Sequence, residues 1–250
     1  MAYAGTISFA DGTVLHQWLL IESSGQLAKM CVKEGLSALC DAKAESRRKE
    51  VLGERLLMKK IFGIDTPIMH NADRMPYIEN SDTHISIAHT KGYLAIALNH
   101  HHSMGIDVEQ YQRRVLNVRD GFLNDAEQQW LKADDELAHM IAWTAKEAIF
   151  KTIGDRSRVK SYRNEIIIHP FATPHIGRQI SHIGTFKSED FALQTLLTAT
   201  HILTLSCKNK KFLRQEHSEH SEHSEHSEHS ENSDKKQNTY LIHLTRFTPI

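Results

Sequence analysis

Two acidic residues in the segment 105–109, Gly-Ile-Asp-Val-Glu, could together bind a metal ion. Because apolar and acidic residues alternate, a β-strand would direct Ile106 and Val108 to one face and Asp107 and Glu109 to the other. Two like charges about 6 Å apart repel by roughly 2 to 3 kcal/mol at an effective dielectric of about 20, and a divalent cation would reverse that repulsion. Carboxylate oxygens favour Mg²⁺ or Ca²⁺ over Zn²⁺. The segment predicts either a hard-cation site or a strand with a solvated acidic face.

A second group of residues follows at helical spacing. Trp143, Glu147 and Lys151 recur every four residues, which places them on one face of a helix. A glutamate followed four residues later by a lysine is also an ordinary surface ion pair, worth about 0.3 to 0.5 kcal/mol. Lys146 points about 100 degrees away from Glu147 on the same helix, where it could contact a phosphate or remain solvated. The spacing alone therefore leaves a reactive face and a surface pair both open.

The two motifs in this order resemble the signature of the 4'-phosphopantetheinyl transferase superfamily. That signature is Gly-Ile-Asp-x-Glu on a strand, followed by Trp-Thr-x-Lys-Glu-Ala-x-x-Lys, which this chain has at 143–151. Further segments resemble the larger, surfactin-synthetase-activating type of the family. They are Ile-Ala-His-Thr at 87–90, Phe-x-x-x-x-Glu at 122–127, and a basic helix that opens with Arg47 and Arg48. The family commonly has Gly-Lys-Pro before the histidine element, whereas this chain has Arg74-Met75-Pro76.

This resemblance implies an enzyme, a holo-[acyl-carrier-protein] synthase or 4'-phosphopantetheinyl transferase. It would transfer the phosphopantetheine arm of coenzyme A to a serine of an apo acyl or peptidyl carrier protein and release adenosine 3',5'-bisphosphate. The implied cofactor is Mg²⁺, held by Asp107, Glu109 and Glu147. The alternative is a non-catalytic relative that binds the carrier protein or coenzyme A without transfer. Neither the general base nor the carrier can be read from the residues, although Glu147 and a metal-bound water are candidate bases.

The resemblance also implies which side chains contact the substrate. Glu147 and Lys151 would be catalytic, with Lys151 beside the charge that develops on the pyrophosphate. Coenzyme A would further contact Lys146, the histidine His89, and the arginines Arg47, Arg48 and Arg74. Arginine matches phosphate geometry with two hydrogen bonds, but the sequence does not distinguish Arg47 from Arg48.

Composition bounds the class of protein. The chain has 250 residues, a net charge of −1 and 24% charged residues, far from the basic balance of a nucleic-acid binder. No run approaches the roughly 20 apolar residues of a membrane span, and the first residues carry no basic segment typical of a signal peptide. The three cysteines have no Cys-x-x-Cys spacing, so we expect reduced thiols. We therefore expect a cytoplasmic protein that uses neither nucleic acid nor membrane.

The implied fold is α+β, with two pseudo-symmetric halves that each pack a small antiparallel sheet on a long helix. Apolar periodicity predicts helices at 44–62 and 138–153, and a hairpin with strands at 85–90 and 93–98 places His89 beside its turn. Asn124 and Glu127 match a capping box. Further strands are expected at 104–108, 165–169, 191–197, 201–207 and 240–245. The boundary is expected in 99–103, dividing the chain into 1–102 for coenzyme A and 103–250 for metal and catalysis. Such a fused chain needs no second copy to complete its cleft, so we expect a monomer.

The segment 216–231 repeats His-Ser-Glu five times. Having almost nothing to bury, it predicts a disordered loop between two strands. Its histidines also leave open a third interpretation, a metal-binding or scaffold protein acting through the repeat.

Overall fold

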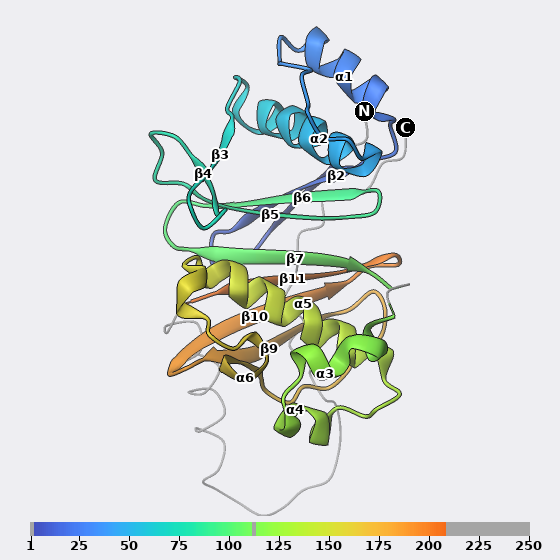
Figure 1. The fold of residues 1–250 in the computed structure, drawn as a ribbon, viewed down its shortest axis with the longest axis vertical. Coiled ribbons are helices and arrows are strands. Elements are labelled where there is room, and N and C mark those ends of the chain that lie inside the picture. The colour runs from blue at the N-terminus through green and yellow to red at the C-terminus, as the bar shows by residue number, and fades with distance from the viewer. Residues whose placement is uncertain (1–2, 112–113, 209–250) are drawn as a thin grey trace, which may run out of the picture.

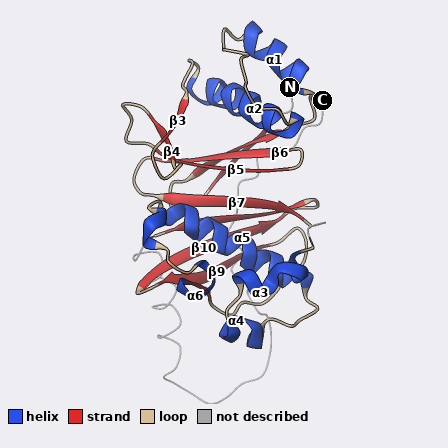
Figure 2. Ribbon diagram, in the orientation of Figure 1, coloured by secondary structure: helices blue, strands red, loops and turns tan. Residues whose placement is uncertain are grey.

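The computed structural model describes residues 3–111 and 114–208, so the repeat at 216–231 and the expected strand at 240–245 lie outside the described residues. Figures 1 and 2 show an amino-terminal half with α1 and α2, and a carboxy-terminal half built around α5. The elements of the first half are β1 (Tyr3–Ser8), β2 (Val14–Leu19), α1 (Ser24–Lys33), α2 (Glu45–Phe62), β3 (Ile68–His70), β4 (Pro76–Ile78), β5 (His84–Thr90) and β6 (Tyr93–Asn99). Those of the second half are β7 (Met104–Gln110), η1 (Val115–Val118), α3 (Arg119–Phe122), α4 (Asp125–Trp130), α5 (Glu136–Ile153), η2 (Arg156–Arg158), α6 (Tyr162–Glu165), β8 (Ile166–Ile168), β9 (Gln179–Phe186), β10 (Glu189–Leu197) and β11 (His201–Cys207).

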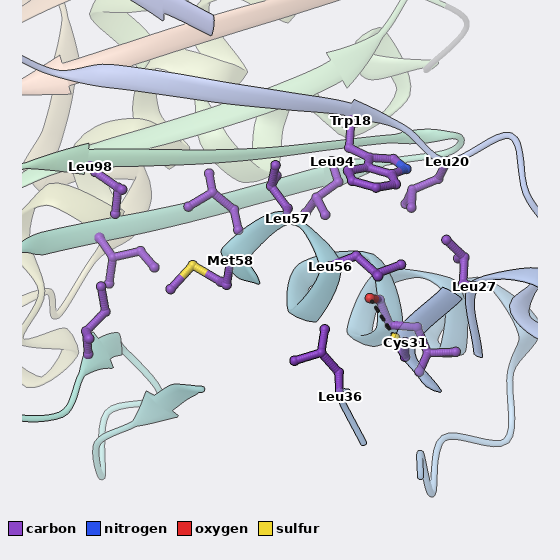
Figure 3. Close-up of a cluster of buried hydrophobic side chains, with 14 residues drawn as sticks. Trp18, Leu20, Leu27, Cys31, Leu36, Leu56, Leu57, Met58, Leu94 and Leu98 are labelled. Atoms are coloured by element: carbon purple, nitrogen blue, oxygen red, sulfur yellow. Dashed lines mark hydrogen bonds between the residues drawn. The ribbon is translucent and has the colours of Figure 1, made fainter. Parts of the chain in front are cut away.

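In the first half, α2 packs on a four-stranded antiparallel sheet in the order β1-β2-β6-β5, and α1 packs against α2 (Figure 1). Leu52, Leu56 and Leu57 give α2 its buried stripe, and Gly63 ends the helix in the left-handed conformation at φ 73°. Figure 3 shows Leu56 and Leu57 with Trp18 and Leu94 of the sheet in one apolar cluster. This packing anchors the helix on which Arg47 lies.

Strand β6 is buried on both faces, because its alternate residues enter two different cores. Leu94, Ile96 and Leu98 face the cluster under α2. Ala95 and Ala97 enter a second cluster that also contains Ile106 and Val108 of β7. The backbone N–H of Ile106 donates to Ser86 Oγ of β5 at 3.0 Å. These contacts join the two halves, with β5 against β7.

The second half packs α5 on a five-stranded antiparallel sheet in the order β7-β11-β10-β9-β8. Gly105 of β7 permits the close approach of this helix. A Cβ there would collide with the carbonyl oxygen of Ala148 and lie 2.6 Å from the backbone nitrogen of Thr152. The glycine that opens the 105–109 motif is therefore required for α5 to lie directly over the acidic strand.

Most of the expected elements are present. The helices expected at 44–62 and 138–153 are α2 and α5, and the expected hairpin is β5-β6 with Gly92 in its turn at φ 76°. The expected strands at 104–108, 165–169, 191–197 and 201–207 correspond to β7, β8, β10 and β11. Helix α1 and the strands β1, β2, β3, β4 and β9 are among the elements that the sequence patterns did not predict. The antiparallel α+β class is thus confirmed, whereas the pseudo-symmetry of the halves stays a prediction.

The chain passes from β6 to β7 through residues 100–103, within the segment where the boundary was expected. Among the described residues, no helix is long and apolar enough to cross a membrane.

Candidate functional site

The acidic strand β7 presents its two faces as the alternation predicts. Ile106 and Val108 are buried in the core between the sheets, and Asp107 faces α5. Asp107 is 8% exposed, its Oδ1 atom accepts a hydrogen bond from Lys151, and its buried Oδ2 atom has no hydrogen-bond partner. Burial raises the pKa of Asp107 to about 7; Lys151 opposes this rise, and the charges of Glu147 and Glu109 add to it. The site therefore holds more negative charge than its lysine neutralises.

Lys151 connects the acidic strand to the first half of the molecule. Its Nζ atom lies 3.0 Å from Asp107 Oδ1 and 2.9 Å from the carbonyl oxygen of Ile106. It also lies 3.4 Å from the carbonyl oxygen of Ile87 on β5. The side chain is 26% exposed, so its ammonium group is partly shielded at the junction of the two halves. Such a cation interacts more strongly with a neighbouring anion than one in open water.

The other two acids of the predicted metal site each accept a hydrogen bond from an aromatic side chain. Trp143 donates from Nε1 to Glu109 Oε1 at 3.1 Å, and the Tyr162 hydroxyl donates to Glu147 Oε1 at 2.9 Å. Phe122 meets the Trp143 ring edge-on, with centroids 5.1 Å apart. Of the three residues predicted to share a helix face, Trp143 and Lys151 thus contact the acids of β7, whereas Glu147 accepts from Tyr162 of α6 while its charge acts on Asp107.

A second polar cluster lies on α2 and β5. Arg47 contacts two glutamates through Nη1, at 3.0 Å from Glu50 Oε2 and 3.6 Å from Glu54 Oε1. His89 lies with Nδ1 3.5 Å from Glu50 Oε1. Burial lowers the pKa of His89, opposed by Glu50 and assisted by Arg47 and Lys151. Because the charge of Lys151 acts on His89, this cluster and the β7 site form one electrostatic unit.

The structure distinguishes the two arginines that open α2. Both are exposed, but Arg47 contacts Glu50 and Glu54, whereas the charge of Arg48 acts on Glu45 at the start of the helix. Arg74 lies elsewhere, in the turn between β3 and β4, where it is exposed and has φ 61°. Of the three arginines expected to bind coenzyme A, Arg47 is the one in the cluster with His89.

Lys146 requires a correction, because neither a phosphate contact nor a solvated position describes it. Its side chain is 0% exposed and its Nζ atom lies 2.7 Å from Glu127 Oε2, with Glu127 itself 1% exposed. The ammonium also donates to the carbonyl oxygens of Arg163 and Ile166, at 3.2 and 2.5 Å. All three of its protons are thus used inside the protein. Lys146 is not among the ligand contacts that we propose.

Glu127 completes that buried pair and confirms the predicted capping box. Asn124 and Glu127 cap α4 reciprocally, each side chain accepting from the other's backbone N–H. The second carboxylate oxygen, Oε1, accepts from the backbone N–H of Ile168 at 2.8 Å. Glu127 therefore ties α4 to α5 and β8 and does not line the β7 site.

The donor chemistry of the β7 site fits a hard divalent cation, since it offers carboxylate oxygens with excess negative charge and an unpartnered Asp107 Oδ2. The side chains are not gathered around one point, however. Across residues 3–111 and 114–208, no group of three or more His, Cys, Asp or Glu side chains is close enough to hold a metal ion. Binding through Asp107, Glu109 and Glu147 would require side-chain rotation toward Asp107.

Some residues of the site were not anticipated. Glu50 and Glu54 follow Arg47 at three and seven residues, a helical spacing that could have indicated a shared face. Tyr162 lies on the separate helix α6, and no spacing in the sequence connects it with Glu147. Only the packing of α6 beside α5 brings that hydroxyl to the carboxylate.

Comparison with protein families gives a match in the carboxy-terminal half. Residues 103–206 match the family model described as the 4'-phosphopantetheinyl transferase superfamily. The match begins just before β7, ends within β11, and includes Asp107, Glu109, Glu147 and Lys151. No curated protein sequence matches the chain. Residues 103–206 are thus similar to a phosphopantetheinyl transferase superfamily domain, which supports a transferase.

Proposed function

We propose that this protein transfers the 4'-phosphopantetheine arm of coenzyme A to a serine hydroxyl of an apo acyl or peptidyl carrier protein. The observation that carries the proposal is the pairing of β7 with α5 inside the family match, where Asp107 meets Lys151 and Glu109 meets Trp143. Serine Oγ would attack the phosphorus that bears the pantetheine arm. The bond to the second phosphate would break, and adenosine 3',5'-bisphosphate would leave.

In this proposal, Lys151 holds the charge that develops on the pyrophosphate. Its Nζ atom already lies among oxygen atoms of Asp107, Ile106 and Ile87, so it is directed into the junction between the halves. A preorganised cation in a partly dry site stabilises such charge without further reorganisation. Glu147 is our candidate for accepting the serine proton, and a water molecule is the alternative acceptor.

The residues that would hold Mg²⁺ are Asp107, Glu109 and Glu147. Magnesium at this site would supply charge neutralisation for the pyrophosphate and would orient its oxygens. The excess negative charge around Asp107 supports this assignment. The protein's own contribution is to hold Asp107 and Lys151 at 3.0 Å with Gly105 admitting α5 close to the strand.

The phosphates on the nucleotide side of coenzyme A would be bound by the cluster on α2 and β5. Arg47 and His89 supply the donors there, and the carbonyl of Ile87, two residues before His89, is already in contact with Lys151. A ligand could thus extend from the β7 site to α2 along Lys151, His89 and Arg47. These amino-terminal residues lie outside the family match, so the assignment to the surfactin-synthetase-activating type is part of the proposal.

The test is a transfer assay with intact-mass measurement of the carrier. Purified protein, Mg²⁺ and coenzyme A are mixed with several apo carriers, and one carrier should gain the mass of a single phosphopantetheine arm. Lys151→Met should abolish the gain, and Lys33→Met, an exposed lysine in the last turn of α1, serves as its matched control. No mass gain on any carrier, with folded protein, would contradict the proposal.

The alternative, a non-catalytic relative, is favoured by one observation. The three acids are not gathered into a metal site in the described part of the chain. Such a relative would bind coenzyme A or an apo carrier, measured by calorimetry, with and without Mg²⁺ and yet produce no mass gain. Deletion of residues 217–230 without loss of transfer would exclude a function that depends on the His-Ser-Glu repeat.

A further inference from the structure

Glu50 bridges the two donors of the proposed anion site. Its Oε2 atom lies 3.0 Å from Arg47 Nη1 and its Oε1 atom lies 3.5 Å from His89 Nδ1. The Glu50 side chain is 17% exposed, whereas Arg47 and His89 are 47% and 39% exposed. The carboxylate is therefore more buried than the two side chains it contacts, and Arg47 and His89 remain accessible to a ligand.

This contact favours one position for the ring proton of His89. An ionised carboxylate can only accept, so the 3.5 Å ion-pair distance favours the tautomer that carries the proton on Nδ1, the nitrogen beside Glu50. In a neutral imidazole Nε2 then lacks a proton and can only accept. A phosphate dianion also only accepts, so neutral His89 in this tautomer cannot bind it through Nε2. A second proton on the ring removes the conflict.

We propose that Glu50 is a positioning residue that holds the Nδ1 proton of His89, so that His89 binds a coenzyme A phosphate through Nε2 only as the doubly protonated imidazolium. The inference rests on the proposed function, in which Arg47 and His89 meet a phosphate of coenzyme A. It adds a consequence: binding of coenzyme A takes up a proton at His89. The proton comes from solvent, and no bond of coenzyme A changes in this step.

The charges around His89 agree with this assignment. Glu50 and Arg47 act on it from α2, and Lys151 acts on it from α5. Burial, Arg47 and Lys151 favour the neutral ring, so the pKa of His89 lies below its usual value despite Glu50. An incoming phosphate dianion adds negative charge next to the ring and reverses that balance. His89 is thus neutral before the ligand arrives and charged afterwards.

The decisive experiment compares wild-type protein with Glu50→Gln. A glutamine can donate its amide N–H to Nδ1, which moves the ring proton to Nε2 and lets neutral His89 bind phosphate. Calorimetry of coenzyme A binding at pH 7.5, in buffers of different ionisation enthalpy, counts the protons taken up. Wild-type protein should take up about one proton more per coenzyme A than Glu50→Gln. As the pH rises by one unit, its affinity for coenzyme A should therefore fall about tenfold more than the affinity of Glu50→Gln. Glu34→Gln, at the exposed end of α1, should match the wild type.

The outcomes separate the two proposals. Absence of coenzyme A binding by the wild type would overturn the proposed function. Binding with equal proton uptake in wild type and Glu50→Gln would overturn the inference alone. If Glu50→Gln does not fold, ¹⁵N NMR of the free wild type decides, with the resonance assigned through His89→Asn. The Nδ1–H tautomer supports the role of Glu50, and the Nε2–H tautomer overturns it.

Discussion

Replacing Lys146 with methionine tests whether the buried ion pair holds the carboxy-terminal half together. Lys146 and Glu127 are 0% and 1% exposed, so the substitution leaves the Glu127 carboxylate without its cation inside the protein. Two backbone donors, the N–H groups of Asn124 and Ile168, still contact that carboxylate. Breaking a buried pair on one side typically costs about 3 to 5 kcal/mol of unfolding free energy. We expect a loss in that range for Lys146→Met at pH 8.

The loss of unfolding free energy in Lys146→Met should depend on pH, because the Glu127 carboxylate is then buried without a cation. Without Lys146, burial should raise the folded-state pKa of Glu127 above its unfolded value. A raised carboxyl pKa means that the folded state binds the extra proton, so stability is retained at low pH and falls as the pH rises. Lys146→Met should therefore be less destabilising at pH 5 than at pH 8.

The assay is urea unfolding followed by tryptophan fluorescence, because Trp143 and Trp130 both pack against the core of this half. Lys132→Met is the matched control, since Lys132 is exposed in the loop before α5. Adding Glu127→Gln to Lys146→Met should cost less than the two single changes together. A Lys146→Met protein within about 1 kcal/mol of the wild type would refute the reasoning, especially if its coenzyme A affinity fell instead.

Three further changes test the site and its support. Gly105→Ala should destabilise the protein by about 1 to 3 kcal/mol and slow transfer, because the added Cβ forces α5 away from β7. Thermal unfolding measures the destabilisation, and Gly121→Ala is the control because a Cβ there meets open space. Burial raises the pKa of Glu54 to about 7, above an unfolded value of about 4.5, so the contribution of Glu54 to stability should fall by about 2.5 kcal/mol as pH rises from 5 to 8. Glu54→Gln should remove that fall. The prediction is contradicted if urea unfolding at several pH values gives the same pH dependence of stability for Glu54→Gln and the wild type. Asp107→Asn should lower Mg²⁺-dependent transfer by more than about 100-fold with the fold retained by circular dichroism, since even residues behind metal ligands cost about 10- to 100-fold.

Local residue patterns in the sequence predict much of the secondary structure. The apolar stripe of Leu52, Leu56 and Leu57 predicts α2 because a helix repeats every 3.6 residues, and Gly63 ends it where the pattern stops. Alternation at 105–109 likewise predicts which face of β7 carries Asp107. By contrast, β9 has intermediate burial at alternate positions and a histidine toward the interior, so its strand pattern is weak in the sequence.

Part of the candidate site can likewise be predicted from the sequence, and part depends on packing between elements. The chemical types and the order of Asp107, Glu109, Glu147 and Lys151 are visible in the sequence, because each motif is local and each spacing maps onto one element. Packing across elements decided the remaining assignments. Lys146 and Lys151 look equally available on one helix, yet α4 and β8 cover the first and leave the second partly open.

The sequence by itself determined the acidic strand, the helix that follows it, and the family that these motifs resemble. Only the tertiary structure decided that Arg47 rather than Arg48 joins His89, because adjacent residues on α2 point about 100 degrees apart and a single face meets β5. It also decided that Lys146 is internal and that Tyr162 reaches Glu147. These contacts join residues on different elements, and their distances depend on how α5 and α2 lie against their sheets, which no local periodicity encodes.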